Sequence, residues 1–362
     1  LWLPDRFKEI SPVPVHSEQS VSGLLSQALT ALEAGDDETA RTLAARAEEL
    51  STDALALANS ALVHGYVDQH AGEMESALQR LGHAAALAAD HRDVPEGVSL
   101  YLHATMAMAT VYRVQGRYTP AEQLLVAAVG RVEERATAED IVAAYNELGV
   151  LFKYSGKFEA AAGFYKRALD RLSGTTSPEL ATLYHNIAGL AHARGDYAAA
   201  EDPARKAVAV RTEALGPDHP DVAADCAALA PILLEIGEAG EAESLLRKAL
   251  GIFEKAYGAD HYEVGIATGN LAAVMHQSGR PEEAKARYER SLAILERALG
   301  SQHPELAPVL NNFAQLIRET DPHGAQAALE RARLSLVSAS VEESHPTLMA
   351  VNACLSELKN QK

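Results

Sequence analysis

Four histidines recur at a fixed spacing in the C-terminal half of the chain and are the first candidates for chemistry. They are 42 residues apart, at His219, His261, His303 and His345, and all but His261 precede a proline. Histidines that share a zinc ion place their nitrogens about 2 Å from it, whereas equivalent positions in stacked helices are about 10 Å apart. Proline favours the first turn of a helix, and a polar residue before it can cap free backbone N–H groups. The spacing therefore predicts capped helix starts rather than a metal site.

Other histidines could in principle bind a metal or transfer protons. Five of them cluster in the N-terminal third, at His64, His70, His83, His91 and His103, but their spacings match no zinc signature. We therefore predict no metal and no cofactor. A different trio, His103, Glu147 and His185, could project from neighbouring helices into one pocket and transfer protons. No nucleophile motif or phosphate-binding loop accompanies the trio. An enzyme or small-molecule site there is the alternative to a non-catalytic function.

The composition of the 362-residue chain argues against several classes of function. Its formal net charge is −18, and nucleic acids and anionic membranes attract cationic proteins, so neither is an expected partner. No apolar run reaches the roughly 18 residues of a membrane span, and the first residues lack the pattern of a signal peptide. The two cysteines, Cys226 and Cys354, are too few for a disulfide framework. These features predict a cytoplasmic location.

A repeated pattern of small residues indicates which elements position these side chains. A glycine is followed five residues later by an alanine at Gly35, Gly72, Gly116, Gly156, Gly195, Gly237 and Gly279, and Thr320 replaces the glycine in an eighth copy. Further small residues stand seven after and eleven or twelve before each alanine. Seven residues span about two helical turns, so these side chains share a face on which a second helix can approach closely. Glycine ends a helix readily. The pattern predicts about eight stacked helix-turn-helix hairpins.

The hairpin pattern resembles the tetratricopeptide repeat (TPR) family. The stretch YNELGVLFKYSGKFEAAAGFYKRAL (145–169) carries the family's signature residues, and the later copies, with LGxxHP between them, resemble the 42-residue kinesin-light-chain type. The resemblance implies an all-α, right-handed superhelical solenoid. We expect an extended N-terminal arm over residues 1–16, a solenoid over residues 17–344 and a capping helix over residues 345–362. The arm could pack on the first repeats or enter the groove.

In this family the first helix of each hairpin lines a concave groove. The resemblance places one set of polar residues on that wall: Asn146, Lys153, Tyr154, His185, Asn186, Asn270, Asn311, Asn312 and Arg318. Asn186, Asn270 and Asn312 share one register, and an asparagine side chain can pair with both polar groups of a peptide backbone. The predicted function is non-catalytic recognition of a peptide or protein segment. The sequence leaves the partner and the oligomeric state open.

Overall fold

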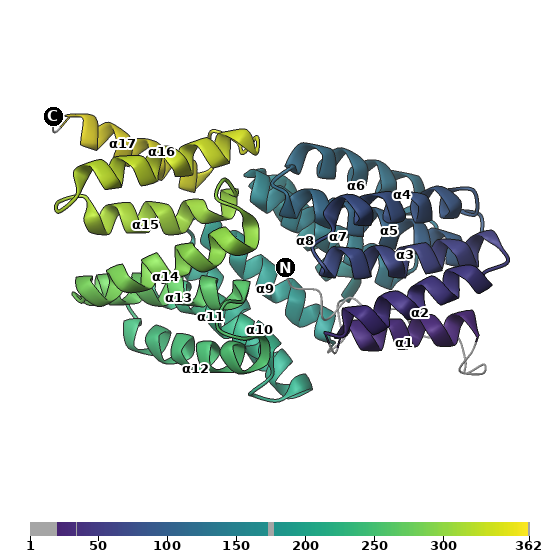
Figure 1. Cartoon of the computed structure of the whole chain (residues 1–362). Helices are drawn as coiled ribbons and strands as arrows, with labels where there is room; N and C mark the ends of the chain where they lie inside the picture. Colours follow the sequence, from purple (N-terminus) through teal and green to yellow (C-terminus); the bar gives the residue numbers. More distant parts are fainter. Residues whose placement is uncertain (1–19, 34, 173–176, 361–362) are drawn as a thin grey trace. The chain divides into compact units, whose positions relative to one another are not determined.

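The computed structural model of the chain describes residues 20–33, 35–172 and 177–360, and all regular structure in these ranges is helical (Figure 1). The first helices are α1 (Val21–Glu33), α2 (Asp37–Leu50), α3 (Ala54–His70), α4 (Met74–Ala89), α5 (Pro95–Val114), α6 (Tyr118–Val132), α7 (Ala138–Ser155) and α8 (Phe158–Leu172). The remainder are α9 (Pro178–Ala193), α10 (Tyr197–Leu215), α11 (Pro220–Glu235), α12 (Ala239–Tyr257), α13 (Tyr262–Gln277), α14 (Pro281–Leu299), the 3-10 helix η1 (Pro304–Leu306), α15 (Ala307–Ile317), α16 (Pro322–Ser338) and α17 (Pro346–Asn360).

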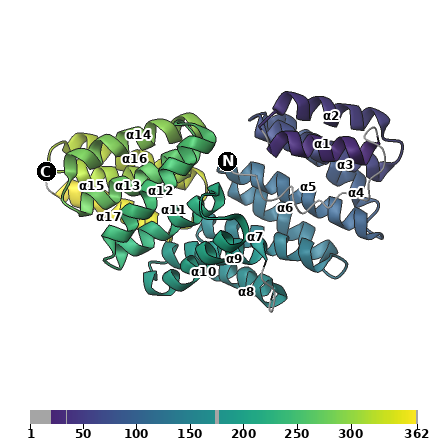
Figure 2. The same cartoon turned by 90° about the horizontal axis from the view of Figure 1, so that it is seen from below.

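The chain divides into two compact units, which we call the N-terminal unit (Leu1–Glu147) and the C-terminal unit (Leu148–Lys362). The boundary falls inside α7. Within each unit, helices that follow one another in the sequence pack side by side, as the two views show for α1–α6 and for α9–α17 (Figures 1 and 2). The all-α repeat architecture predicted from the sequence is confirmed. The predicted N-terminal arm, residues 1–16, lies outside the described residues.

Each hairpin closes through the small residues that the sequence pattern singled out. In α7–α8, Gly149 faces the ring of Tyr165, and a Cβ added at Gly149 would lie 2.2 Å from Cε1 of that ring. In α13–α14, Gly269 faces Ser291, whose hydroxyl donates to the carbonyl of Gly265 at 2.7 Å. The alanines that follow the turns, such as Ala161 and Ala284, are fully buried. Small side chains therefore set how closely the paired helices approach.

The turn glycines end the first helices as predicted. All seven have a positive φ, for example +86° at Gly156, a conformation that other residues adopt at a cost. At this turn the N–H of Lys157 donates to the carbonyl of Phe152, so the last turn of α7 keeps a backbone partner. The glycine thus reverses the chain while the carbonyls of Phe152 and Lys153 keep backbone partners.

The four spaced histidines cap four helix starts in the C-terminal unit, those of α11, α13, η1 and α17. Nδ1 of each ring accepts a hydrogen bond from the backbone N–H two residues later, at 3.2 Å for His219, His303 and His345 and 3.3 Å for His261. Each of the first three is the residue directly before its helix. The prediction that these histidines mark and cap helix starts is confirmed.

One contact in the C-terminal unit joins segments that are far apart in the sequence. The backbone N–H of Glu342, in the loop between α16 and α17, donates to the carbonyl of Ser155 at the end of α7 at 3.0 Å. The ring of His345 lies over Phe158, with centroids 5.5 Å apart, and its Cβ is 3.3 Å from the position of a Cβ at Gly156. The start of α17 is therefore packed against the turn between α7 and α8.

Candidate functional site

The predicted wall residues of the C-terminal unit lie on its first helices with different degrees of burial. Asn186 and Asn311 are buried, at 9% and 7% exposure, whereas His185, Asn270 and Asn312 are half-buried. Arg318 directly follows α15, is exposed, and forms an ion pair with Glu357 of α17 at 3.5 Å. Of the remaining predicted residues, Lys153 and Tyr154 lie near the end of α7, and Asn146 belongs to the N-terminal unit. Whether these residues bind a ligand stays a prediction.

His185 is held in place on this wall by charged side chains from two other helices. Its Nδ1 lies 2.7 Å from Asp225 of α11, and the side chain is 32% exposed. The other oxygen of Asp225 accepts a 2.7 Å hydrogen bond from Arg211 of α10, and both of these side chains are almost completely buried. Arg211 also donates to Thr182 on α9 at 3.1 Å. A buried ion pair therefore fixes the orientation of a partly exposed imidazole.

The repeat pattern did not single out Asp225 or Arg211 as residues of the wall. Asp225 stands inside the apolar run of α11, where an isolated carboxylate is costly to bury without a partner. That cost is a signal that could have suggested a buried cation nearby. The partner, however, is 14 residues earlier on a different helix, and only the fold brings the two together.

The asparagines differ in whether their side-chain amide groups are already hydrogen-bonded within the protein. The side-chain N–H of Asn270 donates to the carbonyl of Ala227 on α11 at 3.3 Å. The side-chain oxygen of Asn311 is buried and has no hydrogen-bond partner among the described residues. A buried amide oxygen without a partner is unfavourable. It is therefore a place where a ligand N–H or a water molecule would stabilise the wall.

Near the start of the C-terminal unit, Lys153 brings a positive charge to the wall. Its ammonium lies 5.0 Å from the ring of Tyr154 and close to Gly189, where a Cβ would be only 3.2 Å from Nζ. Burial, together with the charge of Lys153, lowers the pKa of His192 to about 4. His192 is consequently neutral at physiological pH, and Lys153 supplies the charge in this part of the wall.

The alternative site at His103, Glu147 and His185 is divided between the two units, because His103 and Glu147 belong to the N-terminal unit and His185 to the C-terminal one. Glu147 is buried and accepts a hydrogen bond from Thr110 at 3.2 Å. His103 lies 3.6 Å from Asp140, and Ser99 lies 3.3 Å from each of them. Ser99 is the fifth residue of α5, so the helix uses its own backbone N–H and Ser99 supplies no oxyanion-hole donor.

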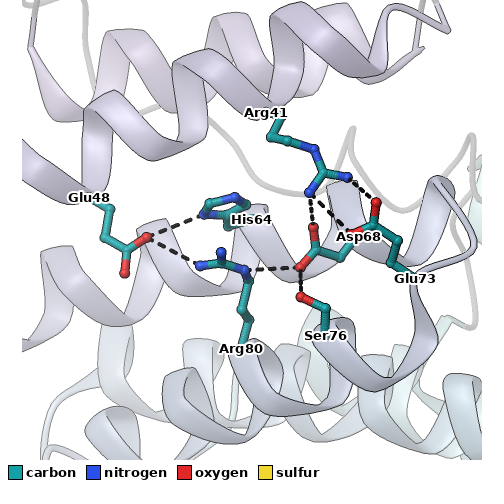
Figure 3. Close-up of polar contacts among 7 residues, drawn as sticks. All are labelled: Arg41, Glu48, His64, Asp68, Glu73, Ser76 and Arg80. Atoms are coloured by element: carbon teal, nitrogen blue, oxygen red, sulfur yellow. Dashed lines mark hydrogen bonds and ion pairs between the residues drawn. The ribbon is translucent and has the colours of Figure 1, made fainter.

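A charged cluster in the N-terminal unit ties together α2, α3 and α4 (Figure 3). Its centre is Asp68, which is fully buried and accepts hydrogen bonds from Arg41 at 2.7 Å, Ser76 at 2.5 Å and Arg80 at 2.9 Å. Glu48 approaches Nδ1 of His64 at 3.2 Å and Arg80 at 3.5 Å. Burial, followed by the positive charge of Arg80, lowers the pKa of His64. The polar groups of the cluster largely satisfy one another.

The structure also bears on metal binding, on the state of the cysteines and on membrane-spanning helices. In the described residues, His, Cys, Asp and Glu side chains nowhere gather in threes as a metal ion would require. His64 instead pairs with Glu48, and His70 lies 2.6 Å from Asp37. Cys226 and Cys354 are both free thiols. Among the described residues, no helix is long and apolar enough to span a membrane.

Comparison with known proteins assigns the chain to a family. The family model described as "Tetratricopeptide repeat" matches residues 101–174, 179–255, 225–297 and 263–333, which together make up more than half of the chain. The chain belongs to the tetratricopeptide repeat family. No curated protein sequence matches it significantly.

Solved structures show the same fold at low sequence identity. A Rap protein complexed with Competence and Sporulation Factor is 13% identical, with a TM-score of 0.58 over 94% of this chain and 98% of that one. A tetratricopeptide repeat protein from Parabacteroides merdae is 13% identical, with a TM-score of 0.51 over 82% and 99%. A protein described as a kinesin light chain from Podosopora anserina is 22% identical, with a TM-score of 0.40 over 56% and 97%. The family membership and the fold support a protein-binding scaffold.

Proposed function

We propose that the C-terminal unit binds a peptide or an extended protein segment along its first-helix wall, without catalysing a reaction and in the cytoplasm. The observation that carries the proposal is the geometry of His185. Asp225 and the buried Arg211 fix one ring nitrogen, and the partly exposed ring keeps Nε2 for a ligand. Hydrogen-bonding groups that are held in place before binding lose little entropy on binding.

The asparagines supply the second part of the proposal. Asn186, Asn270 and Asn312 stand at one register on α9, α13 and α15, so a ligand running across these helices would meet an amide group at each of them. Each amide can donate to a backbone carbonyl and accept from a backbone N–H. Binding would then depend on the ligand's main chain, with His185 and Lys153 adding selectivity. The net charge of −18 favours a neutral or basic ligand.

The likeness to the Rap protein also supports binding over catalysis. That protein was solved in complex with Competence and Sporulation Factor, and its fold matches 94% of this chain. The alternative, an enzyme or small-molecule site that uses His103, Glu147 and His185, takes its residues from both units. Ser99, the hydroxyl beside His103, supplies no oxyanion-hole N–H of its own.

A peptide selection followed by titration tests the proposal. A random peptide library displayed on phage is panned against the full chain, and a selected peptide is titrated by calorimetry. Each neutral hydrogen bond contributes about 0.5–1.5 kcal/mol, so the triple variant Asn186→Ala, Asn270→Ala and Asn312→Ala should weaken binding by about two orders of magnitude. His185→Ala should weaken it several-fold.

The control is Glu289→Ala, which removes an exposed charge from the second helix α14. It should leave affinity unchanged. If the triple variant lowers the melting temperature but binds as tightly as the wild type, the asparagines hold helices together and the proposal fails. A selected ligand whose binding depends on His103 and Glu147, and is indifferent to the asparagines, would support the alternative site.

A further inference from the structure

A polar cavity of about 300 Å³ opens between α2, α3 and α4 in the N-terminal unit. All three helices contribute to its lining, which consists of Glu48, Ala61, Ser76, Gln79, Arg80 and His83. Helix α1 precedes these helices and α5 follows them, so the cavity lies within the array of helices and not at its end. Its volume is at the lower end of the range for small-molecule sites, so it fits a small ligand best.

Most of the lining residues stand on one face of α4. Ser76, Gln79, Arg80 and His83 follow the spacing i, i+3, i+4 and i+7. Gln79 and His83 are exposed, and neither forms a hydrogen bond or an ion pair with another described residue. The cavity therefore presents polar groups that the fold itself does not use.

The guanidinium of Arg80 is held from one side. Its Nε donates to the buried Asp68 at 2.9 Å, and its Nη1 lies 3.5 Å from Glu48, so the group sits between two carboxylates (Figure 3). Its Nη2 has no hydrogen-bond partner among the described residues. A guanidinium that is fixed at Nε and open at Nη2 can donate to the carboxylate of a ligand.

Glu48 is held in a similar way. Its Oε2 lies 3.2 Å from Nδ1 of His64. Burial lowers the pKa of His64, so the ring is neutral at physiological pH and Nδ1 donates its proton to the carboxylate. Oε1 of Glu48 has no hydrogen-bond partner in the part of the chain that the structure describes. This oxygen can accept a hydrogen bond from the ammonium of a ligand.

The charges around the cavity favour a ligand that carries both signs. The cluster of Figure 3 contains two arginines and three carboxylates besides the neutral His64, two positive charges against three negative ones. An anion alone would be repelled by Glu48, and a cation alone by Arg80. A free amino acid carries a carboxylate and an ammonium at neutral pH, so it can pair with both groups and leave the charge of the cluster unchanged.

We propose that this cavity binds a free α-amino acid. The ligand's carboxylate accepts from Nη2 of Arg80, and its ammonium donates to Oε1 of Glu48. Gln79 and His83 are left to contact the ligand's side chain. The buried partners Asp68 and His64 hold the two charged groups in place before binding, which limits the entropy lost on binding. This site is separate from the first-helix wall of the C-terminal unit and does not depend on the function proposed for that wall.

Calorimetric titration of the full chain with each protein amino acid in turn, at up to millimolar concentration, tests the proposal. We expect at least one amino acid to bind saturably. Its methyl ester lacks the negative charge, and its N-acetyl derivative lacks the positive charge. Because each loses one charge-assisted hydrogen bond, both should bind about tenfold more weakly or worse.

A change at Glu48 tests whether binding occurs in this cavity. Glu48→Gln keeps the shape of the side chain and an acceptor for His64 but removes the charge, so the affinity for that amino acid should fall about tenfold. The matched control is Glu75→Gln, which changes an exposed carboxylate of α4 outside the cavity and should leave the affinity unchanged. Melting temperatures of the unliganded variants separate a lost contact from a lost fold.

Four results would overturn the proposal. In the first, no amino acid binds to the full chain. In the second, the ester or the N-acetyl derivative binds as tightly as its parent amino acid. In the third, Glu48→Gln and Glu75→Gln have the same affinity. In the fourth, binding survives Glu48→Gln and is lost in His185→Ala, which would assign the amino acid to the first-helix wall instead.

Discussion

At the scale of single residues, His303 shows how one side chain fixes the start of a helix. Its ring is 5% exposed, and Nδ1 accepts the N–H of Glu305. Loss of a cap costs about 0.5–2 kcal/mol, so we expect His303→Ala to lower the free energy of unfolding by that amount in urea titrations. His323→Ala, which removes an exposed histidine from α16, is the control and should have little effect. Equal effects would show that the cap contributes nothing specific.

Alanine substitution of two glycines in the same hairpin should change the stability of the protein in opposite directions. A Cβ at Gly149 would overlap the ring of Tyr165, whereas a Cβ at Gly163 on α8 would meet no atom within 4 Å. Overpacking of this kind costs about 1–3 kcal/mol, so Gly149→Ala should destabilise the protein. Gly163→Ala should stabilise it by about 0.5–1 kcal/mol, because alanine restricts the unfolded helix segment. Thermal melts of both variants give the signs, and a shared sign would mean that the helix contact is misassigned.

Residue roles could be predicted from sequence where they depend on neighbours along the chain. The histidine caps and the small residues of the hairpins are of this kind, because both act on partners a fixed number of residues away. Asp68 is of the other kind. Two repeats later the same place, four residues before the turn glycine, is held by Phe152, and a carboxylate there suggests solvent exposure. It is buried because Arg41 and Arg80 come from two other helices, a pairing that only the fold reveals.

At the scale of elements, the hairpins follow from the sequence, but one of their helices is divided in an unforeseen way. The first helix of the last hairpin begins as η1 after His303 and becomes α-helical only at Ala307. Pro308 explains the break, because proline has no N–H to donate to the carbonyl of Pro304 four residues earlier. The spacing of small residues predicts that a helix is present, whereas its local geometry depends on a proline inside it.

The start of α17 gives the C-terminal unit a dependence on pH. Burial against the turn between α7 and α8 lowers the pKa of His345 from 6.5 to about 4. The folded chain then binds this proton more weakly than the unfolded chain. The stabilisation is complete above pH 6.5 and is lost as the pH falls from 6.5 towards 4, by about 1.4 kcal/mol per pH unit. Urea titrations at pH 6.5, 5.5 and 4.5 should show a shallower decline for His345→Gln, and parallel declines would contradict this.

At the scale of the whole molecule, a solenoid is stabilised mainly by contacts between successive hairpins. The ion pairs between second helices follow this rule, for example Glu254 with Arg290 and Glu296 with Arg331. The contact of Glu342 and His345 with residues 155–158 does not, because the segments are more than half the chain length apart in the sequence. A repeat pattern cannot predict this contact, because the pattern describes how each hairpin packs on the next and not which distant hairpins touch.

This contact makes a prediction about how a local change spreads within the C-terminal unit. His345→Ala removes the ring that packs on Phe158, so hydrogen exchange should accelerate at the amide of Glu342 and also in the turn between α7 and α8. The turn between α11 and α12 lies between these segments in the sequence and should not change, because the effect passes through the contact and not along the array.

His219→Ala is the matched control for this measurement. It removes the same kind of histidine cap, from α11, and leaves the ring of His345 over Phe158 in place. Exchange should then accelerate around α11 and stay unchanged at Glu342 and in the turn between α7 and α8. If both variants accelerated hydrogen exchange in that turn equally, the effect would be transmitted from hairpin to hairpin along the array. The Glu342–Ser155 hydrogen bond would then contribute nothing of its own to holding the two ends of the C-terminal unit together.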